Sequence, residues 1–237
     1  MSRTNLMKAA INGNAEMVKA LIPYEAGKRD NDGYTALMLA AQCNNPECVK
    51  LLIPHEVDLH HANTQITALT LAAQLNNTEC VKLLIPHQAG LRDKGDETSL
   101  MHAALCGNHE CVKLLIPHEA GSQTLYGGET ALIWAAMGGE HECVKLLIPD
   151  EAGNQDKRGR TALMLAARSG HAECVKLLIP HEANLNDKDG KSVLDYAIDD
   201  EIRKLIQDYL KKKEIDDEEI VLSIPPLKKK LIINFST

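Results

Sequence analysis

The stretch Glu-Cys-Val-Lys-Leu-Leu-Ile-Pro occurs five times in this 237-residue chain, at Glu47–Pro54, Glu79–Pro86, Glu110–Pro117, Glu142–Pro149 and Glu173–Pro180. A sixth, degenerate copy lies at Glu16–Pro23. The cysteines of the five copies are 31 or 32 residues apart. A fixed period in this range is typical of stacked small units, each of which buries its apolar face only against its neighbours. The sequence therefore predicts a repeat protein.

A second recurring run lies between these copies and reads Thr-Ala-Leu-x-x-Ala-Ala, with Ser for the first Ala in one unit; it begins at Thr35, Thr67, Thr98, Thr130 and Thr161. Threonine can cap a helix by accepting a bond from a free backbone N–H. The leucine and the two alanines that follow recur at helical spacing on one face. This run therefore predicts a short helix that neighbouring units can approach closely.

The opening stretch itself predicts the second helix of each unit. Its apolar face is formed in the second unit by Val49, Leu52 and Ile53. We expect the Ile-Pro step to end this helix, because proline lacks the N–H and crowds the preceding turn. A polar connection such as Asp30–Gly33 then follows, with residues that favour turns.

The combined pattern, Asp-x-x-Gly-x-Thr-Ala-Leu-x-x-Ala-Ala followed by Glu-Cys-Val-Lys-Leu-Leu, resembles the ankyrin repeat from about Thr4 to Leu210. The resemblance implies an all-α ankyrin-repeat solenoid of about seven stacked helix-turn-helix units, with projecting hairpin-like loops and terminal units that act as caps. We expect units near 1–33, 34–65, 66–96, 97–128, 129–159, 160–190 and 191–213. Residues 214–237 would form a disordered or docked tail, with β-prone runs at 220–224 and 231–235.

Charge and composition exclude several classes of protein. A formal net charge of −7 argues against a nucleic-acid binder, which needs a basic surface to neutralise phosphates. We expect neither a signal peptide nor a membrane span, because the first residues lack an apolar run of 7–15 residues and no stretch approaches roughly 20 apolar residues. We expect a monomeric cytoplasmic or nuclear protein. Its five repeated cysteines should form a buried column roughly 10 Å apart, too far for disulfides, with Cys43 and Cys106 outside it.

The chain has ten histidines, a residue type that can bind metals or act in catalysis. Four follow the repeated proline, and three begin second helices, so the repeat itself explains their positions: His55, His87, His118 and His181; His109, His141 and His171. Phosphate-binding loops and nucleophile elbows are missing from the sequence. We expect no enzyme activity, catalytic residue, cofactor or metal site. Trp134 replaces a leucine of other units, which favours a core position over a stacking platform.

The positions that differ between units flank the turn of each projecting loop, called a finger here, and the last turn of the first helix. In ankyrin-repeat proteins such positions line the concave recognition face, so the resemblance implies these protein-binding residues: Arg29, Asp32, Tyr34, Gln42, His61, Gln65, Ile66, Gln74, Leu75, Arg92, Asp96, Glu97, Leu105, Gln123, Tyr126, Glu129, Met137, Lys157, Arg158, Arg160 and Arg168. The last four make a basic group that either binds an acidic or phosphorylated peptide or is merely solvated.

The function favoured by these patterns is a non-enzymatic scaffold or adaptor that binds another protein on the concave face. The alternative is a regulatory subunit or targeting module of an enzyme such as a kinase. A metal-dependent enzyme that uses the His/Cys set is a third hypothesis. The start at Met1 and the capped ends favour a complete array over a fragment of a larger enzyme.

Overall fold

The computed structural model describes residues 2–223, with side chains as far as residue 216. Within this part every regular element is a helix. The first helices of the pairs are α1 Asn5–Ile11, α3 Ala36–Gln42, α5 Ala68–Gln74, α7 Ser99–Leu105, α9 Ala131–Gly138 and α11 Ala162–Ser169. The second helices are α2 Ala15–Glu25, α4 Pro46–Glu56, α6 Thr78–Gln88, α8 His109–Glu119, α10 His141–Glu151 and α12 Ala172–Glu182. The short α13, Val193–Tyr196, and the long α14, Asp200–Ser223, complete a seventh pair.

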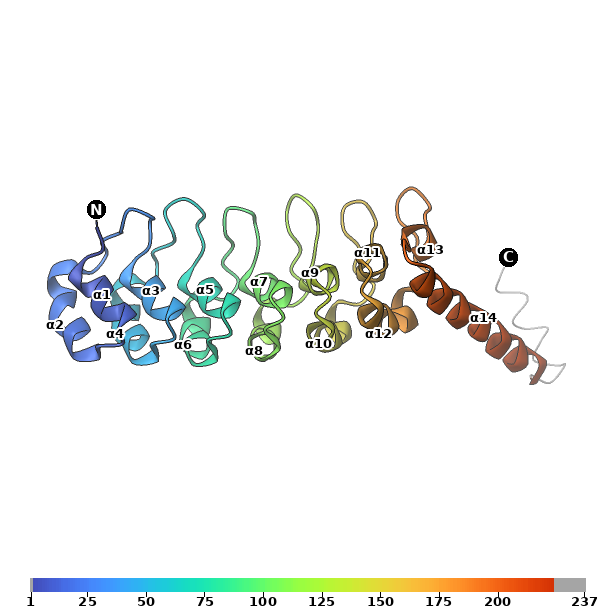
Figure 1. Cartoon of the computed structure of the whole chain (residues 1–237), viewed down its shortest axis with the longest axis horizontal. Coiled ribbons are helices and arrows are strands. Elements are labelled where there is room, and N and C mark those ends of the chain that lie inside the picture. The colour runs from blue at the N-terminus through green and yellow to red at the C-terminus, as the bar shows by residue number, and fades with distance from the viewer. Residues whose placement is uncertain (1, 224–237) are drawn as a thin grey trace.

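The pairs stand side by side in one extended row, in chain order, with the N-terminus near one end (Figure 1). A loop projects from every unit to the same side of the row, so that the loops form a line of fingers above the helices (Figure 1). The all-α repeat architecture predicted from the sequence is therefore confirmed.

The first helices are built as the sequence indicates. In each full unit the threonine side chain accepts a bond from the backbone N–H three residues later, as Thr35 does from Met38 at 3.4 Å. Leu37, Ala40 and Ala41 are fully buried, as are their counterparts in the later units. Small side chains at these positions let adjacent first helices pack closely and leave one narrow core running along the row.

The second helices do not end at the Ile-Pro step, so that prediction was wrong. In every copy the proline lies inside the helix, which in the second unit runs on to Glu56. The exposed Pro54 faces solvent near the helix end, where the carbonyl that loses its partner can bond to water. Beyond it, the backbone N–H of Val57 still bonds to the carbonyl of Ile53 at 3.2 Å.

The reason that the helix continues is a buried glutamate two residues after the proline. Glu119 is 2 % exposed, and one carboxylate oxygen accepts the backbone N–H of Leu100, near the start of α7, at 2.7 Å. The other oxygen accepts the N–H of Gly90, in the preceding unit, at 3.0 Å. Each such side chain therefore joins its own two helices to the unit before it. The same double contact is made by Glu56, Glu151 and Glu182.

One junction replaces this carboxylate by an amide. Gln88 accepts the N–H of Leu69 at 2.9 Å, but its amide nitrogen donates to the carbonyl of Val57 at 2.6 Å. The preceding turn is different here, because Val57 has ψ −29° where Ala26 has ψ 145°, and this flips the next peptide group. Elsewhere a glycine of positive φ, such as Gly27, supplies an N–H at this point. The side chain is therefore a carboxylate where the preceding turn presents an N–H, and an amide where it presents a carbonyl.

The five repeated cysteines are free and lie in the core, at most 1 % exposed, whereas Cys43 and Cys106 are exposed. The predicted burial of the five repeated cysteines, without disulfides, is confirmed. Burial raises the thiol pKa of Cys80, Cys111 and Cys174 to about 11 and that of Cys143 to about 12. These thiols therefore stay protonated and act as small apolar side chains.

Helix α14 continues through residues 214–223, past the expected boundary at 213. Residues 220–223 of the first β-prone run are therefore helical, while 224–237, with the second run, lie outside the described residues. No helix in the described part is long and apolar enough to cross a membrane.

Candidate functional site

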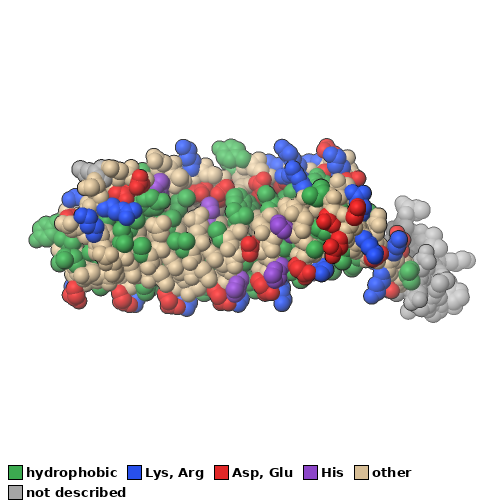
Figure 2. All heavy atoms as spheres, viewed as in Figure 1, with side chains coloured by type: hydrophobic (Ala, Val, Ile, Leu, Met, Phe, Trp, Pro, Cys, Tyr) green, Lys and Arg blue, Asp and Glu red, His purple; other side chains and the backbone are tan. Residues whose placement is uncertain are grey.

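The exposed side of the second helices, called the outer face here, carries a repeated ion pair. Lysine and glutamate three residues apart approach to 2.6–2.7 Å in four units: Glu47–Lys50, Glu79–Lys82, Glu110–Lys113 and Glu173–Lys176. Acidic and basic side chains accordingly alternate along the lower edge of the molecule (Figure 2). Since these charges are paired within their own helices, the four pairs offer little net charge to a partner.

The fingers and the exposed ends of the first helices form a second surface, called the finger face here. Large apolar side chains are exposed on it in the middle of the row, including Leu75, Leu105, Leu125, Tyr126 and Met137, which are 39–77 % exposed. Figure 2 shows apolar side chains over the middle of the row on the finger side. An apolar cluster of this kind, rimmed by polar groups, is typical of an interaction site.

A hollow of about 400 Å³ opens at the centre of the finger face, between the loops before α7 and α9. This central hollow is lined by Gly95, Glu97, Leu105, Thr124, Tyr126, Gly127, Glu129, Trp134 and Met137. It combines two aromatic rings, two aliphatic side chains and two carboxyl groups, without any lysine or arginine. Burial raises the pKa of Glu97, and the nearby Asp93 and Glu129 carboxylates act in the same direction, while His102 opposes them.

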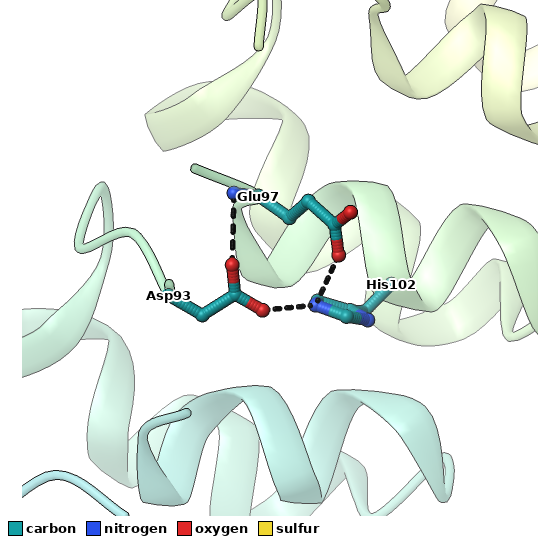
Figure 3. A group of neighbouring side chains, drawn as sticks. All are labelled: Asp93, Glu97 and His102. Atoms are coloured by element: carbon teal, nitrogen blue, oxygen red, sulfur yellow. Dashed lines mark hydrogen bonds and ion pairs between the residues drawn. The ribbon is translucent and has the colours of Figure 1, made fainter. Parts of the chain in front are cut away.

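Behind the hollow, three ionisable side chains meet (Figure 3). The Nε2 atom of His102 lies 3.0 Å from a carboxylate oxygen of Asp93 and 3.3 Å from one of Glu97. Its Nδ1 atom contacts the side-chain amide of Gln74 at 2.9 Å. Asp93, Glu97 and His102 are close enough together to hold a metal ion. This set differs from the hypothetical His/Cys site of the sequence analysis, because it contains no cysteine. It combines two residues of the loop before α7 with His102 of α7.

The same arrangement has a structural counterpart in other fingers. One carboxylate oxygen of Asp93 accepts two backbone N–H groups of its own turn, and His102 donates to the other. The equivalent aspartates behave alike, with Arg3, Arg160 and Tyr196 as the donors to Asp30, Asp156 and Asp187. His102 is therefore the counterpart of the donors that this finger aspartate has in other units, and its bond to Asp93 holds the loop to α7.

The basic group on the fifth finger is not free to bind an anion as a whole. Arg160 donates one hydrogen bond of 2.6 Å from Nε to Asp156, whose side chain is fully buried, and its Nη2 lies 2.6 Å from the same carboxylate oxygen. The surroundings of Arg158 and Arg168 contain three carboxylates and one further cation: Asp187, Asp189, Asp195 and Lys191. This mixture of signs makes the region a weak anion site compared with an uncompensated arginine cluster.

The structure divides the residues that the sequence proposed for binding into two groups. Leu105, Tyr126 and Met137 meet at the central hollow together with Glu97 and Glu129. Exposed side chains outside it are Asp32, Gln42, Gln65, Leu75, Gln123, Lys157, Arg158 and Arg168, and Ile66, Gln74, Asp96 and Arg160 are half-buried.

Several of the proposed residues hold fingers together instead. Arg29 donates to the carbonyls of Gly33 and His60, and Arg92 donates to those of Asp96 and Gln123, so each arginine spans two fingers. His61 is buried, and its ring lies 4.6 Å from that of Tyr34. These contacts give the four side chains a structural role, whether or not they also contact a partner protein.

Sequence reasoning did not assign Trp134, Asp93 and His102 to the finger face. Trp134 is half-buried and lines the hollow, where the sequence favoured a core position. A signal was present, because Trp134 and His102 replace leucine at the same position of successive first helices. Two glutamates also precede the capping threonine in these same two units.

Comparison with known proteins agrees with this architecture. A family model described as ankyrin repeats matches residues 2–63, 55–124 and 132–218. The ankyrin repeat domain of human ASB11 is similar in structure, with a TM-score of 0.72 and 23 % identity over 86 % of this chain and 97 % of that one. The ankyrin repeat domain of Bcl-3, described as a unique member of the IkappaB protein family, has a TM-score of 0.75 and 22 % identity over 86 % and 98 %.

A search of curated proteins found no match. At these identities the two solved structures establish a shared fold, while the three matches to the family model cover most of the sequence. Ankyrin repeats are in general protein-interaction modules, and a module of this kind has protein partners. The chain belongs to the ankyrin-repeat family.

Proposed function

We propose that this protein is a non-enzymatic scaffold or adaptor that binds a partner protein on its finger face, centred on the fourth and fifth units. The observation that carries the proposal is the exposed apolar cluster of Leu105, Tyr126 and Met137 around a hollow in an otherwise polar surface. Exposed side chains of this size bury apolar area when a partner covers them, which is the main favourable term in association.

The scaffold supports this role by holding the fingers in place before a partner arrives. Neighbouring fingers are joined by backbone bonds, such as Lys94 N–H to the Thr64 carbonyl and Lys157 N–H to the Gly127 carbonyl, both 2.8 Å. A surface that is ordered in advance loses less entropy on binding. The repeated buried glutamates further restrict movement of one unit against the next.

The test is affinity capture from native lysate with quantitative mass spectrometry. Leu105→Asp combined with Met137→Asp places two charges in the apolar cluster, and Lys82→Asp combined with Lys113→Asp places two aspartates on the outer face. We expect the first variant to lose the partners that the wild type captures and the second to retain them. Equal capture by both variants would refute the proposed face, provided that circular dichroism shows both to be folded.

The identity of the captured protein separates the two roles that remain for such an array. A partner without catalytic activity makes this protein a scaffold or adaptor. A stoichiometric enzyme whose rate changes on addition of purified protein makes it a regulatory subunit.

A further inference from the structure

We propose that the central hollow receives an arginine side chain of the partner protein, flanked by apolar partner residues that cover Leu105 and Met137. This inference rests on the proposed function and adds the chemistry of the bound segment. It follows from three features of the hollow: carboxylates without a lysine or arginine partner, aromatic rings beside them, and an apolar rim.

The two carboxylates at the hollow lack a lysine or arginine within the described part of the chain. The ion-pair partner of Glu97 is His102, at 3.3 Å. Glu129 is bonded by the hydroxyl of Thr124 at 2.5 Å, and no cation lies within ion-pair distance of it among the described residues. The outer-face glutamates differ, because four of them already have a lysine. The hollow thus brings together two carboxylates that have no lysine or arginine partner among the described residues.

The repeat places these two carboxyl groups beside each other. Glu97 and Glu129 occupy the same position in successive units, directly before the capping threonine. The units before them have Tyr34 and Ile66 there, and the next has Arg160. The negative side chains are thus confined to two adjacent fingers, and both line the same hollow. A partner cation placed between these fingers can approach both carboxylates.

Two aromatic side chains complete the site. Trp134 forms part of the floor and Tyr126, 77 % exposed, part of the rim. A cation over an aromatic face is attracted by the ring, most strongly by tryptophan. The planar guanidinium of arginine can stack on a ring and still donate to carboxylates through its edge, whereas the ammonium of lysine is a strongly hydrated point charge. The combination of rings and carboxylates therefore favours arginine over lysine.

The chain carries its own reporter for this site, since Trp134 is its only tryptophan. Its fluorescence and the NMR signal of its indole N–H can be followed during titration with acetyl-Gly-Leu-Arg-Leu-Gly-amide. Matched peptides replace arginine by lysine or by citrulline, which keeps the shape but removes the charge. We expect saturable changes with the arginine peptide and at least about tenfold weaker binding of the citrulline peptide, because charge-assisted bonds are lost.

Variants of the full chain test the carboxylates individually. We expect Glu97→Gln and Glu129→Gln each to weaken binding of the arginine peptide about fivefold, as loss of one partly exposed charged contact does. Glu110→Gln, on the outer face, is the matched control and should leave binding unchanged. Equal binding of the arginine and citrulline peptides, no saturable change with arginine, or unchanged binding by both variants would each overturn the inference.

The captured partner distinguishes failure of this inference from failure of the proposed function. Loss of the partner on both Leu105→Asp with Met137→Asp and Glu97→Gln with Glu129→Gln supports both. Loss with the aspartate pair alone keeps the binding face but refutes the arginine contact. Retention by both pairs refutes the face and, with it, the inference.

Discussion

The outer face and the finger face of this protein are made from the same repeated units, yet their side chains are used in opposite ways. On the outer face four units carry the same Glu–Lys pair, closed at 2.6–2.7 Å. On the finger face the residue before the capping threonine changes along the row, from Tyr34 and Ile66 through Glu97 and Glu129 to Arg160. The four repeated pairs are satisfied within their own helices, whereas Glu97 and Glu129 have no lysine or arginine partner among the described residues.

This difference shows where energy is available for recognition. An exposed lysine–glutamate pair on one helix contributes only about 0.3–0.5 kcal/mol and has little left to offer a ligand. The apolar side chains and carboxylates at the central hollow still face water. The repeated residues therefore hold the fold together, and the candidate site is formed by residues that differ from one unit to the next.

The largest effect should come from a repeated group that is buried. Glu119→Ala removes the acceptor of two backbone N–H groups, those of Leu100 and Gly90. Each buried donor left without a partner costs about 1–3 kcal/mol, so we expect a loss of about 3 kcal/mol in the free energy of unfolding. Urea denaturation measures it. Glu110→Ala, on the exposed side of the same helix, is the control, and equal losses for the two variants would contradict the role given to the buried carboxylate.

An exposed tyrosine on the finger face should matter for binding and not for folding. Tyr126→Ala removes a side chain that is 77 % exposed at the rim of the hollow, and Tyr24→Ala removes one that is 76 % exposed on α2. We expect the first to weaken binding of a captured partner roughly 30-fold, or about 2 kcal/mol, as aromatic interface residues often do. The second should change affinity less than twofold. Surface plasmon resonance with the purified partner decides, and a reversed order would assign recognition to the outer face.

The amide at the second junction provides a smaller test within the frame. Gln88→Glu points a carboxylate at the carbonyl of Val57, where the amide now donates at 2.6 Å. We expect a loss of about 1.5 kcal/mol at pH 7 from two facing acceptors. The folded protein should raise the pKa of the introduced carboxyl, since the neutral acid can donate. The loss is therefore full above that raised pKa and disappears as the pH falls to about 4, near the ordinary value for glutamic acid.

A second substitution should restore this junction. Asp58→Gly allows the turn with positive φ that the other units use, so that an N–H faces the new carboxylate. Combined with Gln88→Glu it should recover most of the lost stability at pH 7. Additive losses for the two changes would mean that the match between turn and side chain has no energetic meaning.

The smallest effect belongs to the outer face. A double-mutant cycle on Glu110 and Lys113, whose side chains meet at 2.7 Å, should give the smallest free-energy effect of these tests, and salt should reduce it further. Thermal denaturation at low and high salt measures it. A coupling as large as the stability loss caused by Gln88→Glu would contradict the description of these pairs as solvent-exposed and weakly stabilising.

The fold could be predicted from the sequence because each unit repeats the same local rules. Threonine caps such as Thr35 and the apolar spacing of Val49 and Leu52 act within one helix, so a linear pattern is enough to find them. The path of the chain beyond Pro54 was not predictable from the same rules. It depends on Glu56, whose partners lie 19 and 29 residues away in two units.

The candidate site was only partly predictable for a related reason. Variation between units pointed to Leu105, Tyr126 and Met137 but also to Arg29 and Arg92, which bridge fingers. A list of variable positions cannot separate side chains that face a ligand from side chains that face the next loop. That distinction requires the hydrogen bonds between units.

The central claim, that recognition occurs on the finger face at the central hollow, is tested most directly by photocrosslinking in native lysate. A benzoylphenylalanine is placed at Tyr126 in one sample and at Tyr24 in the other, two positions that are equally exposed on different faces. We expect a discrete crosslinked partner from position 126 and none from position 24. The same partner crosslinked from position 24 alone would contradict the claim.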